Sequence, residues 1–157
     1  MAKITTRKLS EQDLPLLEWS GGQRHQEYIR EWMERSQTGE LILLGLLEDD
    51  EIIGIGHIDF LMVPKVGTLV ALNVREDKRS QGLGAVFIDA MENEIRKRGL
   101  ESVELRVETK NVRAQKLYEQ LGYRERGTSV ETWEQYGNDG EIEIYTTDAI
   151  IMRKELS

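Results

Sequence analysis

The spacing of apolar residues predicts an alternation of strands and helices in the first part of the chain. Residues 4–9 have the pattern of a short strand, and residues 10–19 that of a helix that begins late because it contains Pro15. Helical spacing of apolar residues resumes in residues 25–36. Residues 40–63 hold two apolar runs separated by an acidic turn, which predicts a β-hairpin.

Strand and helix patterns also alternate in the second part of the chain. Residues 67–74 are predicted to form a strand, and a glycine-containing loop separates them from an amphipathic helix. The apolar residues of that helix recur at every fourth position: Leu83, Phe87, Met91 and Ile95. Residues 102–107 alternate as a strand does, and residues 111–122 predict a second helix with Asn111 as its cap. Residues 123–156 contain strand-like pieces around a polar, glycine-containing loop.

The order of these elements predicts the fold class. A strand, a helix and a strand follow one another in residues 68–107, which implies two parallel strands joined by a helical crossover. The earlier hairpin implies antiparallel neighbours, and Gly54 and Gly56 in its second run indicate a bulge or a close approach of another segment to the backbone. We therefore expect one α/β (α+β) domain, residues 1–157, with a mixed, curved central sheet and flanking helices.

Composition restricts the class of protein further. The 157 residues are 39% apolar and 32% charged, which is ordinary for a globular domain. No apolar run approaches the roughly 20 residues that span a bilayer, and the first residues lack the apolar stretch of a signal peptide. A cytoplasmic location is therefore expected. Without cysteine the chain can form no disulfide and has no thiolate chemistry.

The charge of the chain argues against two classes of partner. The formal net charge of −8 disfavours non-specific binding to nucleic acid or to an anionic membrane. The acidic excess is concentrated in residues 9–51 and 131–157, whereas the middle of the chain is mildly basic. Solvated helix faces and loops explain this distribution without any function, and attraction of ligands of the opposite charge is the alternative.

The loop before the amphipathic helix, residues 79–85, predicts an anion-binding site. The first N–H groups of a helix lack intrahelical acceptors, and the helix dipole adds partial positive charge there. Gly82 and Gly84 permit a tight turn and remove the Cβ atoms that would hold a phosphate away, while Arg79 and Lys78 add charge. A strand–helix turn made only for packing is the alternative.

The loop differs from two common phosphate-binding sequences. Walker A ends in Gly-Lys-Ser/Thr, but here Gly84 is followed by Ala85 and Val86. The dinucleotide fingerprint needs a third glycine where this chain has Phe87. A pyrophosphate suits the predicted geometry, but two glycines alone do not specify which molecule carries it.

Two motifs together resemble one known family. R-S-Q-G-L-G, residues 79–84, comes shortly after a predicted strand and resembles the R-x-x-G-x-G acetyl-CoA loop of the GNAT family of N-acetyltransferases. Residues 111–123 match that family's second signature, N-x-x-A-x-x-L-Y-x-x-x-G-[FY]. The order of motifs and elements is also similar over nearly the whole chain. The resemblance implies the GNAT acyl-CoA N-acyltransferase fold and acetyl-CoA as the acetyl donor.

The resemblance also implies roles for particular residues. Backbone N–H groups of residues 81–85 would cradle the CoA pyrophosphate, and the strand at residues 72–74 would carry a bulge, splay from its neighbour and pair with the pantetheine amides. Tyr118 would be the general acid that protonates the departing thiolate, and Asn111 would help to hold the cofactor. The implied cofactor-binding set is Leu72, Asn73, Val74, Arg79, Ser80, Gln81, Gly82, Leu83, Gly84, Ala85 and Asn111.

Several of these residues also have a purely structural interpretation. Tyr118 lies beside the apolar face of its predicted helix, so it could simply flank the core. Asn111 could be only a helix cap, and Arg79 an ordinary surface charge. The sequence leaves these alternatives open.

The sequence does not identify a general base. The strand of residues 68–74 offers no group that titrates near neutral pH, and Arg106 stands where some members of the family have a glutamate. His57, Asp59 and Glu104 are candidates, as is a chain of ordered water. Attack of an amine on a thioester needs no metal, and no metal-ligating cluster is expected.

In this family the early helices and the last hairpin form the acceptor pocket, and here these segments are the most acidic. Their aromatic residues are Trp19, Tyr28, Trp32, Trp133, Tyr136 and Tyr145. Aromatic walls with nearby carboxylates suit a cationic amine, and the alternative is that these are core aromatic residues and solvated acids without a functional role. We therefore expect an enzyme that acetylates a primary amine of a small cationic molecule.

Two other functions stay open at this point. One is a non-catalytic acyl-CoA-binding or regulatory module, and the other is a protein or peptide acetyltransferase. The expected partner is a small-molecule amine; nucleic acid and membrane are not expected, and a homodimer is left open.

Overall fold

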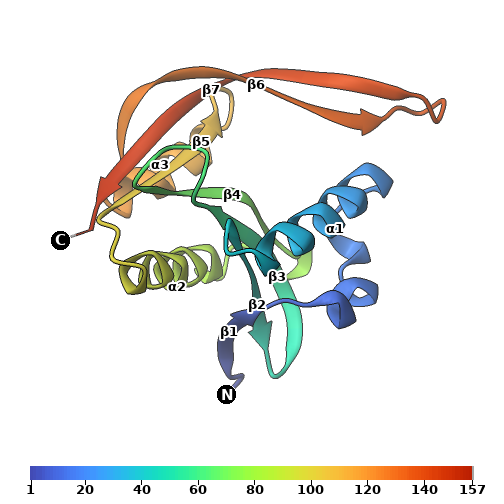
Figure 1. Cartoon of the computed structure of the whole chain (residues 1–157), viewed down its shortest axis with the longest axis horizontal. Helices are drawn as coiled ribbons and strands as arrows, with labels where there is room; N and C mark the ends of the chain where they lie inside the picture. Colours follow the sequence, from blue (N-terminus) through green and yellow to red (C-terminus); the bar gives the residue numbers. More distant parts are fainter. Residues whose placement is uncertain (157) are drawn as a thin grey trace.

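Seven strands form one sheet in the computed structural model, which describes residues 1–156 (Figure 1). The strands are β1 (Ile4–Lys8), β2 (Leu41–Glu48), β3 (Glu51–Asp59), β4 (Val66–Val74), β5 (Ser102–Glu108), β6 (Arg124–Tyr136) and β7 (Ile142–Glu155). The α-helices are α1 (Gln23–Gln37), α2 (Leu83–Lys97) and α3 (Val112–Gln120). In the order β1-β2-β3-β4-β5-β7-β6, β4 and β5 are parallel and the other neighbours are antiparallel. The predicted mixed sheet is confirmed.

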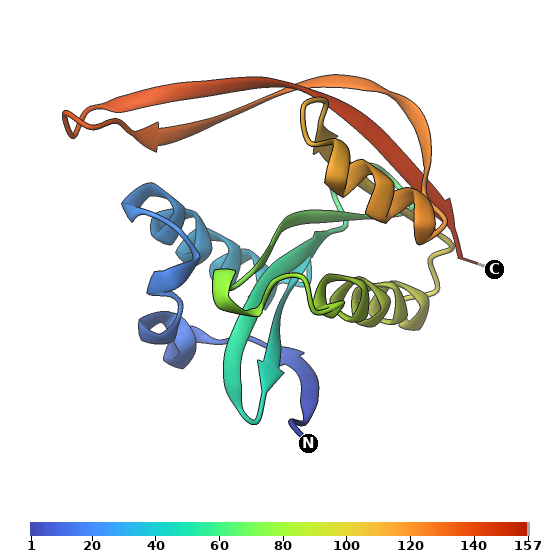
Figure 2. The same cartoon turned by 180° about the vertical axis from the view of Figure 1, so that it is seen from behind.

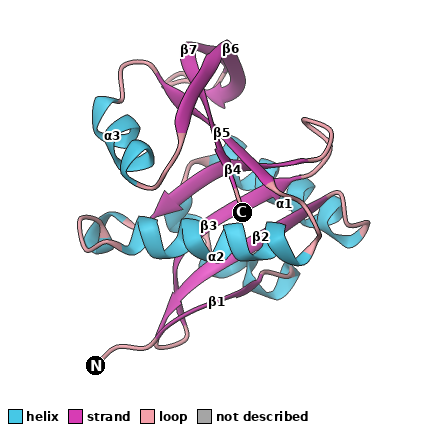
Figure 3. Cartoon of the chain, turned by 90° about the vertical axis from the view of Figure 1, so that its left-hand side faces the viewer, coloured by secondary structure: helices cyan, strands magenta, loops and turns pink. Residues whose placement is uncertain are grey.

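Helices cover both faces of the sheet and enclose two hydrophobic clusters. α2 and α3 pack on one face, over the larger cluster, which includes Phe87 and Tyr123 (Figure 2). α1 packs on the other face, over a smaller cluster that includes Ile29 and Met33. Figure 3 shows α1 and α2 on opposite sides of the strands. No helix within residues 1–156 is long and apolar enough to cross a membrane.

The segment 10–19 differs from the predicted helix. It folds into two short 3-10 helices, η1 (Glu11–Leu16) and η2 (Glu18–Ser20). Pro15 lies inside η1, where it has no N–H to donate and where its ring restricts the residue before it. The segment therefore forms short 3-10 turns in place of the predicted helix with a late start.

The predicted hairpin is formed by β2 and β3. Asp49 and Asp50 make its turn, and both have positive φ (48° and 72°), as a two-residue hairpin turn requires. β3 has one extra residue against β2 between Ile52 and Gly54, so the bulge predicted near these glycines is confirmed at Gly54. The register of β3 against β4 also shifts beside Gly56, but there the extra residue lies on β4. A Cβ on Gly56 would lie 2.9 Å from the side chain of Met91, so the glycine allows α2 to approach the strand.

β4 separates from β5 partway along its length. The pairing stops after Leu69 and Leu105, whereas β4 stays paired with β3 as far as Val74. Ala71 has a φ of 56°, a conformation that residues other than glycine rarely adopt. The second half of β4 therefore has no strand partner on its β5 side. The predicted bulge and splay are confirmed, with the bulge centred just before residues 72–74.

The terminal strand pieces form one long hairpin. β6 and β7 pair along their whole length, and Figure 1 shows the far end of the hairpin extending over α1. The N–H of Glu134 donates to the hydroxyl of Tyr28 (3.1 Å), and Arg24 forms an ion pair with Glu134 (3.1 Å). These contacts tie the hairpin to α1, so that the two elements face each other across one end of β4.

Candidate active site

The loop before α2 presents N–H groups without side-chain partners. Gly82 precedes the helix in the left-handed region (φ 77°), and Ser80 also has positive φ (65°). No side chain caps the first turn, which also contains no acidic residue. A Cβ on Gly82 would meet no atom within 4 Å. Backbone conformation therefore explains this glycine, and close packing does not.

Gly84, in the first turn of α2, has no explanation within the chain. A Cβ at this position would come no closer than 3.9 Å to another residue, the side chain of Leu117. Its φ is not positive, so its conformation does not require glycine either. Glycine nevertheless costs a helix about 1 kcal/mol relative to alanine. Its effect is to leave the start of α2 open.

Arg79 connects the loop to the end of β4. Its Nε donates to the carbonyl of Val74 (2.7 Å) and its Nη2 to Oδ1 of Asn73 (3.0 Å). Nδ2 of Asn73 donates in turn to a main-chain carbonyl of η2 (2.9 Å). Lys78 pairs with Glu48 (3.2 Å). Arg79 therefore fixes the loop on the strand, and its contact with a phosphate stays a prediction.

Arg113 supplies a positive charge that the sequence pattern did not reveal. Its Nη2 donates to Oγ of Ser80 (2.9 Å), so the side chain reaches the loop from the start of α3. Asn111 caps that helix by accepting from the N–H of Ala114 (3.2 Å), which confirms its predicted cap role. Because β4 and β5 are parallel, the helix starts that follow them lie at the same edge of the sheet. The parallel order of β4 and β5 could therefore have predicted that Arg113, at the start of α3, lies near the loop before α2.

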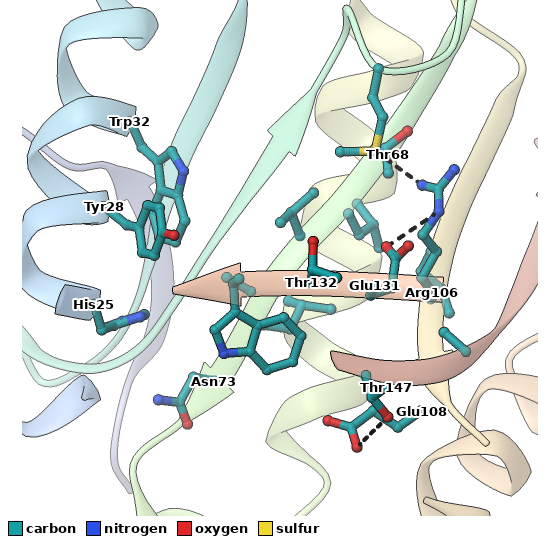
Figure 4. Close-up of a pocket in the computed structure, with 18 of the residues that line it drawn as sticks. His25, Tyr28, Trp32, Thr68, Asn73, Arg106, Glu108, Glu131, Thr132 and Thr147 are labelled. Carbon is teal, nitrogen blue, oxygen red and sulfur yellow. Dashed lines mark hydrogen bonds and ion pairs between the residues drawn. The ribbon is translucent and has the colours of Figure 1, made fainter. Parts of the chain in front are cut away.

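A cavity of about 660 Å³ lies where β4 leaves β5. Its walls come from α1, β4, β5, α3 and the β6–β7 hairpin, most of which Figure 4 draws. Leu72, Asn73 and Tyr118 are the predicted site residues that line it. The others lie outside the lining: Val74, Asn111 and residues 79–85. The splayed half of β4 and Tyr118, the predicted general acid, therefore line the same cavity. The predicted phosphate loop comes after β4 in the chain and lies outside the lining.

Tyr118 satisfies both interpretations of the sequence. It packs against the larger hydrophobic cluster and makes an edge contact with Tyr123, with ring centroids 6.2 Å apart. It also lines the cavity. Burial raises the pKa of the Tyr118 phenol, so the hydroxyl keeps its proton at neutral pH. A proton donor needs this state.

None of the three predicted general bases lines the cavity, and His57 lies behind its aromatic wall. The imidazole is 2% exposed and packs against Trp32, with ring centroids 4.4 Å apart. Burial lowers the pKa of His57 to about 4, against the attraction of Asp59. Its Nδ1 is buried without a hydrogen-bond partner. A neutral, enclosed imidazole fits a structural role better than a catalytic one.

We expect His57 to make folding pH dependent. Its pKa is about 4 in the folded chain against 6.5 for the free group, so between these values the unfolded state binds more protons. Stability should therefore fall by about 3 kcal/mol as the pH falls from 7 to 4. Urea titrations of the natural chain and His57→Phe measure this, and the variant should lose about 3 kcal/mol less over the same interval. Equal losses would show that His57 is not held neutral.

Asp59 and Glu104 are engaged in ion pairs away from the cavity. Asp59 accepts from the N–H groups of residues 61 and 62 and pairs with Arg35 (3.0 Å). Burial acts to raise the pKa of Asp59, but these bonds outweigh it and lower the pKa. Glu104 is 4% exposed and accepts from Nε and Nη2 of Arg153 (2.8 and 2.6 Å). Neither carboxylate is positioned to take a proton from an amine in the cavity.

Two carboxylates that were not predicted line the cavity, Glu108 and Glu131. Burial acts to raise the pKa of Glu108, but hydrogen bonds from Lys110 and Tyr145 outweigh it, so this pKa is lowered. Glu131 forms an ion pair with Arg106 (3.6 Å). The alternation of β5 in the sequence places Glu108 on the same face as Glu104 and Arg106, so Glu108 could have been predicted. Glu131 could not, because only the pairing of β6 in the sheet brings it to the cavity. Within the described residues, no three histidine or acidic side chains gather as a metal site would require.

Half of the six predicted aromatic residues form walls of the cavity: Tyr28, Trp32 and Trp133. Tyr28 and Trp32 stack on one face of α1, with ring centroids 6.1 Å apart. The other three lie outside the lining: Trp19, Tyr136 and Tyr145. Trp19 packs against the smaller hydrophobic cluster, and Tyr145 packs against Trp133 at 4.6 Å between centroids. The prediction that all six face an acceptor is therefore corrected.

Residues 6–123 match the sequence model of the Acetyltransferase (GNAT) family. The match extends over most of the chain and includes the loop and α3. The protein belongs to the GNAT family of acetyltransferases.

A curated relative and two solved structures extend the comparison. Mycothiol acetyltransferase of Beutenbergia cavernae is 36% identical over 97 residues, which are 60% of this chain and 31% of that protein. The chain therefore spans about a third of that relative's length. The fold is shared with the ribosomal-protein-S18-alanine N-acetyltransferase of Escherichia coli (24% identity, TM-score 0.66, 99% of this chain and 95% of that one). It is also shared with the PaiA N-acetyltransferase of Thermoplasma acidophilum in complex with coenzyme A (20% identity, TM-score 0.67, 98% and 99%).

Proposed function

We propose that the protein is an acetyl-CoA-dependent N-acetyltransferase that acetylates a primary amine of a small molecule. The observation that carries the proposal is the opening between β4 and β5 beyond Leu69, which meets a cavity lined by Tyr118. Unpaired strand groups can bind an extended amide chain, and a nearby phenol can donate a proton. Membership of the GNAT family supports the same reaction.

The residues present fit acetyl-CoA. The uncapped start of α2 and the open space at Gly82 suit a pyrophosphate, and a ligand lying against the helix start would explain Gly84. Residues 79–85 would hold the pyrophosphate, with Arg113 as an added charge. The main-chain groups of residues 72–74 would pair with the pantetheine amides.

Bound acetyl-CoA supplies an activated acetyl carbon to this site. A main-chain N–H from the splayed half of β4 would stabilise negative charge on the acetyl oxygen. Tyr118 would donate its proton to the departing sulfur, and burial of the phenol keeps that proton available at neutral pH. The proton released by the amine would pass to Glu108, Glu131 or water.

The lining of the cavity supports an acceptor with an ammonium group. Tyr28, Trp32 and Trp133 offer ring faces to a cation, and Glu108 and Glu131 add negative charge. A volume of about 660 Å³ is ordinary for a small-molecule site. These features support the small cationic amine that the sequence predicts.

Release of CoA, followed with a thiol reagent, tests the proposal on a panel of small amines and of peptides with free N-termini. We expect turnover with at least one small primary amine and none with its acetylated form. Tight binding of acetyl-CoA without turnover of any acceptor would favour a non-catalytic module. Turnover of peptides alone would favour a protein acetyltransferase.

A further inference from the structure

We propose that Arg106 and Thr68 form a carboxylate-binding subsite in the acceptor cavity. The acceptor would then be an amine that also carries a carboxylate, as an α-amino acid does. The inference rests on the proposed N-acetyltransferase function and narrows its acceptor class. It follows from two independent features of the cavity wall.

The first feature is the guanidinium of Arg106, whose donors are poorly used. Its hydrogen bond is to the sulfur of Met62 (3.0 Å), a weak acceptor, although the group carries five N–H donors. The nearest oxygens of Glu131 and Glu104 lie at 3.6 and 3.7 Å, beyond ordinary hydrogen-bond distance. The side chain lines the cavity and is 19% exposed. A planar fork of this kind matches a carboxylate.

The neighbouring charges leave room for a substrate carboxylate. Glu104 is neutralised mainly by Arg153, which makes two short bonds to one of its oxygens (2.8 and 2.6 Å). Glu131 is the remaining counterion of Arg106, and its side chain is 32% exposed. It can therefore turn toward solvent or toward an ammonium group when a substrate carboxylate takes its place.

The second feature is the hydroxyl of Thr68. The residue is 1% exposed and lines the cavity, and its Oγ1 is buried without a hydrogen-bond partner. A buried hydroxyl left unpaired is costly, and an acceptor atom that arrives with a ligand would remove this cost. In the β4–β5 register Thr68 lies opposite Glu104, and Glu104 precedes Arg106 by two residues on β5.

The two features lie at the same end of the cavity. Figure 4 shows Thr68, Arg106 and Glu131 grouped together, and His25, Tyr28 and Trp32 on the opposite side. An acceptor can therefore place its carboxylate at Arg106 and Thr68 and its remaining part toward the aromatic wall. This separation of a polar end and an aromatic end favours an amino acid over a simple polyamine.

Matched acceptor pairs test the inference. The pairs are phenylalanine with 2-phenylethylamine, methionine with 3-(methylthio)propylamine, and lysine with 1,5-diaminopentane; each member differs from its partner only by the carboxylate. We expect kcat/KM to be about 100-fold higher for the preferred amino acid than for its amine. Arg106→Gln should remove most of that advantage, and Thr68→Val should reduce it by about fivefold.

The controls separate a binding role from a structural one. Arg106→Lys keeps the charge without the fork and should recover part of the advantage. Arg126→Gln, the same change at an exposed arginine of β6, should alter neither member of a pair. Equal kcat/KM for both members in the natural chain, or an equal loss for both in Arg106→Gln, would overturn the subsite. If neither the amino acids nor the simple amines are acetylated, the proposed function fails. In that case calorimetry still tests the subsite, and absence of amino-acid binding would overturn it.

Discussion

Replacement of Tyr118 by phenylalanine is expected to lower kcat about 100-fold, because the hydroxyl is the proposed proton donor to the departing sulfur. The affinity for CoA and the thermal stability should change little, since the ring still packs beside Tyr123. Burial raises the pKa of Tyr118 above its ordinary value of 10.0. Deprotonation of Tyr118 should therefore not lower kcat of the natural chain below pH 10. Steady-state rates with saturating acetyl-CoA measure the effect.

Tyr123→Phe is the matched control, because the two rings are in contact but differ in their partners. The hydroxyl of Tyr123 donates to Glu92 (2.8 Å), a buried carboxylate that also accepts from Lys154 (3.0 Å). Its loss should lower the free energy of unfolding by about 2 kcal/mol with kcat nearly unchanged. A Tyr118→Phe variant that keeps full kcat would exclude Tyr118 as the acid.

Gly82→Val is expected to weaken the binding of CoA by about 100-fold or more, measured by calorimetry. Gly82 has a φ of 77°, which a β-branched residue tolerates poorly, so the turn that aims the N–H groups at the start of α2 should change. The new side chain would also stand in the open space where the pyrophosphate is proposed to lie.

The opposite end of the same helix provides the control. Gly99 has a φ of 81°, and a Cβ there would also meet no atom within 4 Å. Gly99→Val should therefore cost a similar amount of stability, about 1–2 kcal/mol, without affecting CoA binding. Equal CoA affinity in the two variants would place the pyrophosphate elsewhere.

Local patterns predicted most of the fold because each depends on residues that are close in sequence. The four-residue repeat of α2, the alternation of β5 and the cap at Asn111 all appear in the structure as expected. The β4 bulge also followed from the motif resemblance. Pro15 was underestimated, because it broke the first helix into 3-10 turns rather than shifting its start.

The functional side chains were harder to assign, because their environment depends on distant residues. His57 and Asp59 were reasonable bases from their residue types, but α1 covers the first with Trp32 and pairs the second with Arg35. Glu104 is compensated by Arg153, which lies far along the chain on β7. Burial and pairing of this kind decide the pKa of a group, and residue type alone does not.

By itself, the sequence determined the order of elements, the family and the loop that is proposed to bind the pyrophosphate. These are properties of short segments: hydrophobic periodicity, glycine at a helix start and two spaced motifs. Only the tertiary structure decided what faces the cavity, because Thr68, Arg106 and Glu131 come from three strands that the sheet brings together. Whether a polar group is left unpaired there depends on every neighbour at once, and local patterns carry no information about neighbours that are distant in sequence.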